Sequence, residues 1–590
     1  MSDLTTLIRQ PLLAGFSAGL ALALAACSAA NNDAHSDAEK KAAAKPVEPV
    51  VQQHVLHEEV DANAAYRAPA KIKAEAASVA GAMEARKMMP QSLPMIAPAP
   101  MADSAQFGYQ DVYREQYQKV ADNPVHAVAE QPVSTFSIDV DTGSYANVRR
   151  FLNDGSLPPQ DAVRLEELVN YFPYAYPQPQ GDTPFGVGTE LATSPWNPQT
   201  RLLRVAIKAS DMQAAELPPA NLVFLVDVSG SMDRREGLPM VQSTLKLLVD
   251  QLRPQDRVAL VTYAGNASVV LESTAGSEKA KIRAAIDQLS AGGSTAGESG
   301  IQLAYQEAQK GLLRDGINRI LLATDGDFNV GISDFETLKQ LAADKRKTGV
   351  SLTTLGFGTD NYNEQLMEQL ADAGDGNYAY IDNLREARKV LVDQLSSTLA
   401  VVAKDVKIQV EFNPAEVSEY RLLGYENRAL KREDFSNDKI DAGEIGAGHT
   451  VTALYEIVPV GAKGWLEPLR YAQAGKDAGK PGEIAWLRLR YKAPEGGSSK
   501  LVEVPIGKGE SVTPIAQASE DLRFAAAVAA FAQQLKEGQY TGDFGLADSA
   551  KLARGAKGED RYGLRAEFVQ LVELAQSLQL SSKGTPVAIE

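Results

Sequence analysis

Oxygen-bearing side chains suited to a hard metal ion occur in three short segments of the chain. They are Asp227, Ser229, Ser231, Thr295 and Asp325. The set holds two carboxylates and three hydroxyls, without an imidazole or a thiolate. Such a set leaves room for water and suits Mg²⁺ before Ca²⁺ or Mn²⁺. These residues therefore predict a cation site, provided that the fold brings the three segments together.

Four short apolar runs predict the elements that would position these side chains. The runs cover residues 222–226, 258–261, 320–323 and 350–355, and helical patterns separate them. Continuous apolar strands that alternate with helices indicate a mostly parallel sheet with helices on both faces. Ligands of such sheets bind at the carboxyl ends of the strands. Asp227 follows the first run directly and Asp325 follows the third run after Thr324, so we expect them to meet at one edge of the sheet.

The three segments resemble the metal-ion-dependent adhesion site of von Willebrand factor type A (VWA) domains. The matching motifs are D-x-S-G-S, a threonine in the second segment and T-D-G. The resemblance implies a Rossmann-like VWA domain over residues 219–399, in which Ser229, Ser231 and Thr295 contact the cation directly. Asp227 and Asp325 would act directly or through water, and an Asp or Glu of a protein partner would complete the shell. No general base, nucleophile or phosphate-binding loop accompanies the motif, so it predicts binding and no catalysis.

The start of the chain predicts export and lipidation. Arg9 precedes an apolar stretch that ends at Cys27, and residues 24–27 read Leu-Ala-Ala-Cys. This resembles the lipobox of bacterial lipoproteins, which implies a signal peptide at 1–26 and a lipid anchor on Cys27. Ser28 is not the aspartate associated with retention at the inner membrane. In a Gram-negative cell, the outer membrane facing the periplasm is therefore favoured; an ordinary signal peptide is the alternative.

The amino-acid composition excludes or disfavours several other kinds of site and partner. One cysteine in 590 residues excludes an intrachain disulfide and a Cys-based zinc site. Of the five histidines, only His449 lies beyond residue 126, which disfavours histidine-dependent catalysis in the body of the protein. The net charge of −17 argues against a nucleic-acid partner, because nucleic-acid affinity depends on lysine and arginine.

The rest of the chain divides by composition. Residues 27–131 read as an Ala/Pro-rich disordered linker, and 132–218 as an extension with helices followed by strands. Residues 400–510 are β-patterned, and 511–590 return to helical periodicity. Because strand patterns lie on both sides of the VWA segment, we expect one β-sandwich into which the VWA domain is inserted.

This arrangement is similar to the YfbK-type family of bacterial lipoproteins, including an extension with the segment Asp-Val-Asp-Thr-Gly-Ser-Tyr at 139–145. The leading interpretation is a cell-envelope lipoprotein that binds a protein partner through Mg²⁺. One alternative is an envelope hydrolase that uses Asp139 and Asp141 or the metal. However, Asp141-Thr142-Gly143 occurs once, whereas an aspartic protease needs two such carboxylates, and a helix-capping turn is the preferred interpretation. The other alternative is a scaffold in which the cation only stabilises the fold.

Overall fold

The computed structural model describes residues 115–213, 215–294, 297–326, 335–359, 362–440, 442–467, 480–509 and 513–583. All of them belong to one unit that runs from residue 105 to residue 590. Cys27, Thr295 and the chain up to residue 114 lie outside the described residues. Within the described part, no helix has both the length and the apolar character that a membrane crossing requires.

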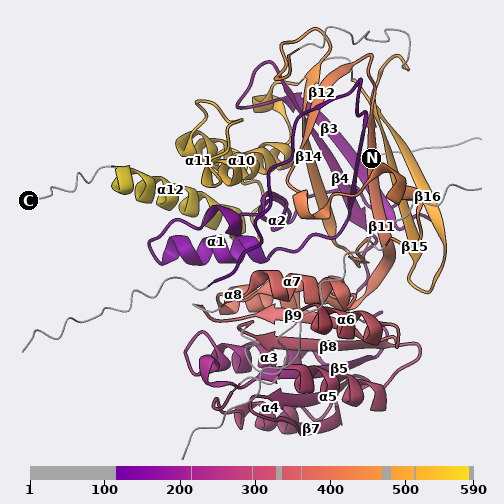
Figure 1. Cartoon of the computed structure of the whole chain (residues 1–590), viewed down its shortest axis with the longest axis vertical. Coiled ribbons are helices and arrows are strands. Elements are labelled where there is room, and N and C mark those ends of the chain that lie inside the picture. Colours follow the sequence, from indigo (N-terminus) through magenta and orange to yellow (C-terminus); the bar gives the residue numbers. More distant parts are fainter. Residues whose placement is uncertain are drawn as a thin grey trace, which may run out of the picture. The chain divides into compact units, whose positions relative to one another are not determined.

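A six-stranded sheet forms the centre of the inserted domain (Figure 1). Its order is β10 (Tyr378–Tyr380), β9 (Ser351–Gly356), β8 (Ile317–Thr324), β5 (Ala220–Asp227), β6 (Arg257–Tyr263) and β7 (Ala267–Ala275). All neighbours are parallel except β7, which runs antiparallel to β6. The four predicted strands are confirmed. The sequence pattern missed β7, because this edge strand alternates between exposed and less exposed residues and lacks a continuous apolar run.

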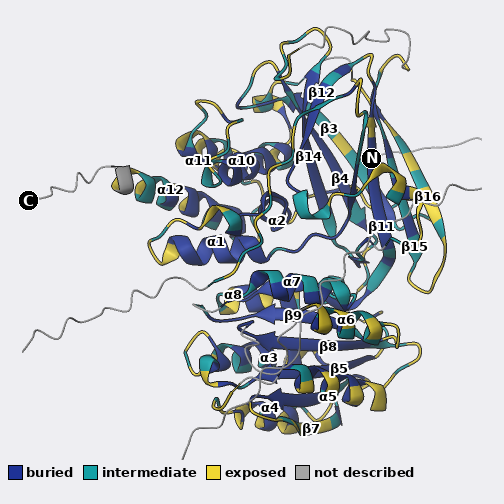
Figure 2. Ribbon diagram, viewed as in Figure 1, coloured by how far each residue is buried: buried dark blue, intermediate teal, exposed yellow. Residues whose placement is uncertain are grey.

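Helices cover both faces of this sheet, as predicted. One face packs against α3 (Leu238–Gln251), α4 (Lys279–Asp287) and α8 (Leu384–Arg388). The other packs against α5 (Gly297–Lys310), α6 (Phe335–Arg346) and α7 (Glu364–Ala373). The two faces thus hold two separate apolar cores, and the strands between them are buried in Figure 2. This double cover explains why apolar residues dominate the central strands β5, β6 and β8.

Two further sheets form a β-sandwich. The first has the order β1 (His126–Ala127), β12 (Val417–Leu423), β14 (Thr450–Pro459), β4 (Arg201–Ala209) and β3 (Phe185–Thr193). The second has the order β13 (Ile445–Gly446), β11 (Val401–Phe412), β15 (Glu483–Ala493) and β16 (Gly496–Gly507), and β2 (Val133–Ser137) also pairs with β11. Both sheets combine strands from before and after the inserted domain, since β4 pairs with β14 and β2 with β11. The predicted insertion is confirmed.

The sequence pattern did not predict β12, the longest of the sandwich strands that it missed. Strand β12 carries Glu419 and Arg421 among its apolar residues, and both side chains are buried. Arg421 forms an ion pair of 2.8 Å with Glu456 of the neighbouring strand β14. The ion partner of Arg421 lies 35 positions later in the sequence, so the local sequence around Arg421 does not show that its charge is compensated. For this reason the charged residues hide the apolar pattern of a core strand.

A layer of helices covers the outer face of the first sheet. It combines α1 (Gly143–Asn153) and α2 (Leu165–Asn170) with α10 (Glu520–Leu535), α11 (Leu546–Arg554) and α12 (Leu564–Lys583). Figure 1 shows the yellow C-terminal helices beside the indigo α1. Phe172 lies between the two groups, with ring centroids 4.9 Å from Phe524 and 5.6 Å from Phe568. Both ends of the described chain therefore build one core on the outer face of the first sheet.

Candidate metal centre

Asp227, the last residue of β5, is held in one orientation by two hydrogen bonds. Its side chain is fully buried. Oδ1 accepts a hydrogen bond of 2.8 Å from the Ser229 backbone N–H, and Oδ2 accepts one of 2.8 Å from the Thr324 hydroxyl. The Thr324 hydroxyl in turn accepts from the Gly326 N–H at 3.1 Å. These contacts join the first and third predicted segments at the carboxyl ends of two adjacent strands.

Ser229 and Ser231 lie next to each other in the turn that follows β5. Their Oγ atoms are 3.0 Å apart. The second predicted segment docks on this turn, because the Gly230 N–H donates to the Gly293 carbonyl at 3.1 Å and the Gly292 N–H to the Val228 carbonyl at 2.7 Å. This contact brings the chain to within two residues of Thr295, whose own position is outside the described residues.

Asp325 completes the described oxygen set. It is fully buried at the end of β8, and Oδ2 lies 4.0 Å from the Arg234 guanidinium. The next residue, Gly326, has φ +79°, so the chain turns in a conformation that favours glycine. Burial raises the pKa of Asp227 to about 6, and the negative charge of Asp325 acts in the same direction. Two carboxylates are thus buried close enough to repel each other.

This donor set fits the cation that the sequence predicts. Asp227, Ser229, Ser231 and Asp325 converge from two strand ends, and all of them offer oxygen. Burying like-charged carboxylates is costly unless a positive charge compensates them. A divalent cation would supply that charge, and hydroxyl and carboxylate oxygens are the ligands that Mg²⁺ prefers. The T-D-G motif of the sequence includes Thr324, and the structure gives this residue a role, because its hydroxyl orients the Asp227 carboxylate.

The second predicted carboxylate pair has a different environment. Asp139 and Asp141 both bind the Arg428 guanidinium, at 3.0 and 3.1 Å. The expected capping role is wrong, because the N-cap residue of α1 is Thr142, whose side chain makes no capping hydrogen bond. The Asp141 carboxylate accepts instead from the Tyr378 N–H at 2.9 Å. The capping turn failed as a prediction because Arg428 and Tyr378 lie more than 200 residues away in the sequence.

Burial raises the pKa of both Asp139 and Asp141 well above the ordinary value, although Arg428 acts in the opposite direction. The same guanidinium also pairs with Glu368 at 2.8 Å and Asp372 at 2.7 Å, both on α7. Four carboxylates therefore surround one arginine. Asp139 and Asp141 thus serve to join the extension to the inserted domain through Arg428.

Three family models match the chain. The model described as "von Willebrand factor type A domain" matches residues 221–394, and the one described as "von Willebrand factor" matches residues 111–204. The model described as "Uncharacterized protein YfbK, C-terminal" matches residues 397–578.

Known proteins match over different lengths. The chain is 52% identical over 472 residues to YfbK of Escherichia coli (strain K12), covering 78% of this chain and 81% of that protein. It is 36% identical over 188 residues to protein sll0103 of Synechocystis sp., covering 32% of this chain and 43% of that protein. The solved von Willebrand factor type A protein from Catenulispora acidiphila matches 66% of this chain and 89% of its own, at 18% identity and a TM-score of 0.36. The chain belongs to the YfbK family and contains a von Willebrand factor type A domain.

Proposed function

We propose that this protein is a cell-envelope lipoprotein that binds a protein partner through a Mg²⁺-dependent site in its VWA domain. The observation that carries the proposal is the convergence of Asp227, Ser229, Ser231 and Asp325 at the carboxyl ends of β5 and β8. Ca²⁺ and Mn²⁺ are the next candidates for the same donors. The role is adhesion or scaffolding and not catalysis.

The protein's own residues would hold the cation and leave a position for the partner. The Ser229 and Ser231 hydroxyls, together with Thr295, would be direct ligands, and the two aspartates would bind directly or through water. An Asp or Glu of the partner would then fill the open position, which makes a charge-assisted contact that depends on the metal. The hydrogen bonds from Ser229 and Thr324 fix the Asp227 carboxylate in advance, so little ordering is left for the moment of binding.

The anchor is the second part of the proposal. Cys27 would carry the lipid, and residues 28–114 would tether the body to the membrane, facing the periplasm from the outer membrane of a Gram-negative cell. The predicted end of the linker at residue 131 is wrong, because β1 (His126–Ala127) already pairs with β12 in the body. Mass spectrometry of the mature protein should find a lipid-modified N-terminal cysteine, and Cys27→Ala should move the protein from the membrane to the soluble fraction. An unmodified Cys27 in mature protein would refute the anchor and leave the metal site untouched.

To test the binding role, the protein is immobilised and exposed to detergent-solubilised cell envelope, and the envelope proteins that it retains are measured. We expect proteins retained in Mg²⁺ to be released by EDTA, and Asp227→Ala or Ser231→Ala to reduce their retention at least tenfold. Asp315→Ala is the matched control, because Asp315 is an exposed aspartate that precedes β8 at the opposite end of the strand. The thermal unfolding midpoint is measured with and without Mg²⁺ in parallel.

The outcomes separate the alternatives. In one outcome, Mg²⁺ raises the unfolding midpoint, but neither EDTA nor the two variants change the retention of envelope proteins. The cation would then be only structural, and the binding role would be wrong. Turnover of a peptide library that Asp141→Ala abolishes would favour the hydrolase. Retention that Asp315→Ala reduces as strongly as Asp227→Ala would also contradict a specific site.

A further inference from the structure

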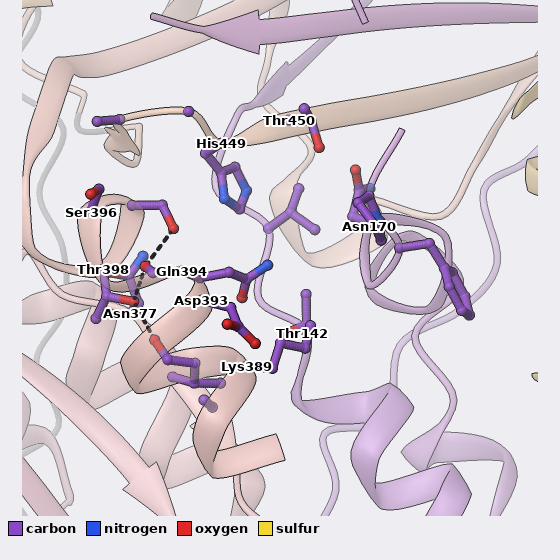
Figure 3. A pocket seen from close by; sticks show the side chains of 18 of the residues that line it. Thr142, Asn170, Asn377, Lys389, Asp393, Gln394, Ser396, Thr398, His449 and Thr450 are labelled. Carbon is purple, nitrogen blue, oxygen red and sulfur yellow. Dashed lines mark hydrogen bonds between the residues drawn. The ribbon is translucent and has the colours of Figure 1, made fainter. Parts of the chain in front are cut away.

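A cavity of about 750 Å³ lies between the VWA domain, the sandwich and the helical layer (Figure 3). Its wall combines the segment 140–142 before α1, residues 385–398 at the end of the VWA domain, the turn 447–450 and the loop 561–564. Cavities of roughly 300–1,000 Å³ are typical of small-molecule sites, which often lie between domains. The cavity is separate from the candidate metal centre, none of whose residues line it.

Several polar side chains of the wall have no hydrogen-bonding or ionic partner among the described residues. They are Thr142, Gln394, Ser396, His449 and Thr450. Figure 3 shows them around a common space, and they come from three separate parts of the chain. The folded protein therefore leaves three hydroxyls, an amide and an imidazole available to a ligand in this cavity.

By contrast, other polar residues of the wall serve the fold. Asn170 donates to the Thr452 carbonyl at 3.1 Å and accepts from the Thr452 N–H at 2.7 Å. The Thr398 hydroxyl donates to the carbonyls of Val390 and Gln394. The unpartnered groups are thus a distinct subset of the lining.

The charge of the wall is opposite to that of the whole protein. Five lysine and arginine residues line it, against three aspartates, whereas the chain carries a net charge of −17. Several of these charges are already paired: Asp211 with Lys208, Asp141 with Arg428, Lys389 with Glu386 and Arg385 with Glu567. Arg388, Arg561 and Asp393 have no ion pair among the described residues, so an excess of positive charge remains on the wall. A net positive cavity in an acidic protein favours an anionic ligand.

Lys389 gives this charge a position, and His449 adds a neutral imidazole to the same wall. Lys389 is only 7% exposed, and its ammonium lies 3.3 Å from Glu386 and 3.5 Å from the centroid of the Tyr171 ring. Burial lowers the pKa of His449 to about 4, and the charge of Lys389 acts in the same direction, so the imidazole is neutral at pH 7 and offers hydrogen bonds and no charge. Arg388, exposed and without an ion pair among the described residues, adds a further cation to the wall.

We propose that this cavity binds a small organic anion that carries a carboxylate or phosphate group. The anionic group would lie beside Lys389 and His449, with hydrogen bonds from Gln394, Ser396 or Thr450. The apolar part would contact Phe172, Leu355 and Leu564, which also line the cavity. Because both flanks of the inserted domain contribute to the wall, the ligand would touch the VWA domain and the sandwich at once. This proposal stands independently of the metal centre.

The test uses three aromatic probes that differ in their polar group: phenyl phosphate, benzoate and neutral benzyl alcohol. Binding to the purified full chain is measured by ligand-observed NMR and by the shift in unfolding midpoint, in EDTA so that the metal centre is empty. We expect at least one anion to bind at one site per chain and benzyl alcohol to bind at least tenfold more weakly. A preference for phenyl phosphate would identify a phosphate ester as the ligand class, and a preference for benzoate a carboxylate.

Two substitutions on the exposed part of the wall probe the site with little risk to folding. Arg388→Glu and Gln394→Glu should each weaken anion binding at least fivefold, because each adds negative charge to the cavity. Arg314→Glu is the matched control, since Arg314 is exposed, has no ion pair among the described residues and does not line the cavity. Absence of anion binding, equal binding of the neutral probe, or equal weakening by Arg314→Glu would overturn the proposal.

Discussion

Glu167 is a buried carboxylate that the fold holds in its protonated form near neutral pH. Its side chain is 3% exposed, and Oε2 accepts a hydrogen bond of 2.8 Å from the Ser144 N–H. Burial raises the pKa of Glu167 to about 8, and the negative charges of Glu368 and Glu166 act in the same direction. The native environment therefore disfavours the charged form that the unfolded chain would carry at pH 7.

This shift predicts that a neutral isostere stabilises the protein. Between the unfolded pKa of about 4.5 and the folded value, the folded state holds a proton that the unfolded state has lost, so the free energy of unfolding falls as pH rises. Glu167→Gln keeps an acceptor for Ser144 and removes this titration. We expect it to raise the free energy of unfolding by on the order of 2–4 kcal/mol at pH 8 and by much less at pH 5.

Urea unfolding at the two pH values measures this effect. Glu278→Gln, at an exposed position of the VWA domain, is the control and should change the free energy of unfolding little at either pH. The interpretation fails if Glu167→Gln destabilises the protein at pH 8, or if its effect is the same at both pH values.

The meeting of Asp227 and Asp325 in the candidate metal centre was predictable because their positions follow from strand ends. Asp227 is the last residue of β5 and Asp325 directly follows β8, and parallel topology brings such ends to one edge. Arg428 was not predictable, because its four partners come from two distant segments and only the folded chain brings them together. Local patterns therefore reveal sites built on strand ends, whereas contacts between domains depend on tertiary packing.

At the scale of elements, Arg428 joins α7 of the VWA domain to the segment before α1. It pairs with Glu368 and Asp372 on α7 and with Asp139 and Asp141 on the extension. Removing one partner from a buried ionic cluster costs about 3–5 kcal/mol, because the remaining charges stay desolvated. Arg428→Gln should therefore weaken the contact between these two elements.

Hydrogen exchange measures this loss element by element. We expect Arg428→Gln to speed amide exchange in α7 and in residues 138–142, while exchange in the central strand β5 stays unchanged. Arg314→Gln removes an exposed arginine of the same domain and should leave all three segments as in the parent. Unchanged exchange in α7 would mean that apolar packing alone holds the two elements together.

At the scale of the whole molecule, the inserted domain leaves and re-enters the sandwich at a single turn. The Gly448 N–H donates to the Ser210 carbonyl at 2.9 Å, and the Ala447 N–H donates to the Ala400 carbonyl at 2.8 Å. The two connections are therefore anchored on adjacent residues. Since the VWA domain also has two apolar cores of its own, the fold has the features of one domain inserted into a loop of another.

This geometry predicts that the two parts fold separately. Residues 219–399 alone should fold and unfold cooperatively, because the whole sheet lies within this segment. If the candidate metal centre binds Mg²⁺ as proposed, Mg²⁺ should raise the unfolding midpoint of this segment. A chain in which a short Gly/Ser linker replaces residues 211–399 should keep its β-sandwich, since Ser210 and Ala400 meet at the same turn. The unfolding midpoint of this linker variant should fall below that of the sandwich in the intact protein, because two arginines of the sandwich part lose their ion partners. Arg149 loses Glu386, at 2.8 Å, and Arg428 loses Glu368 and Asp372 of α7. Circular dichroism and calorimetry of both pieces measure this, and an unfolded linker variant would show that the sandwich needs the VWA domain to form.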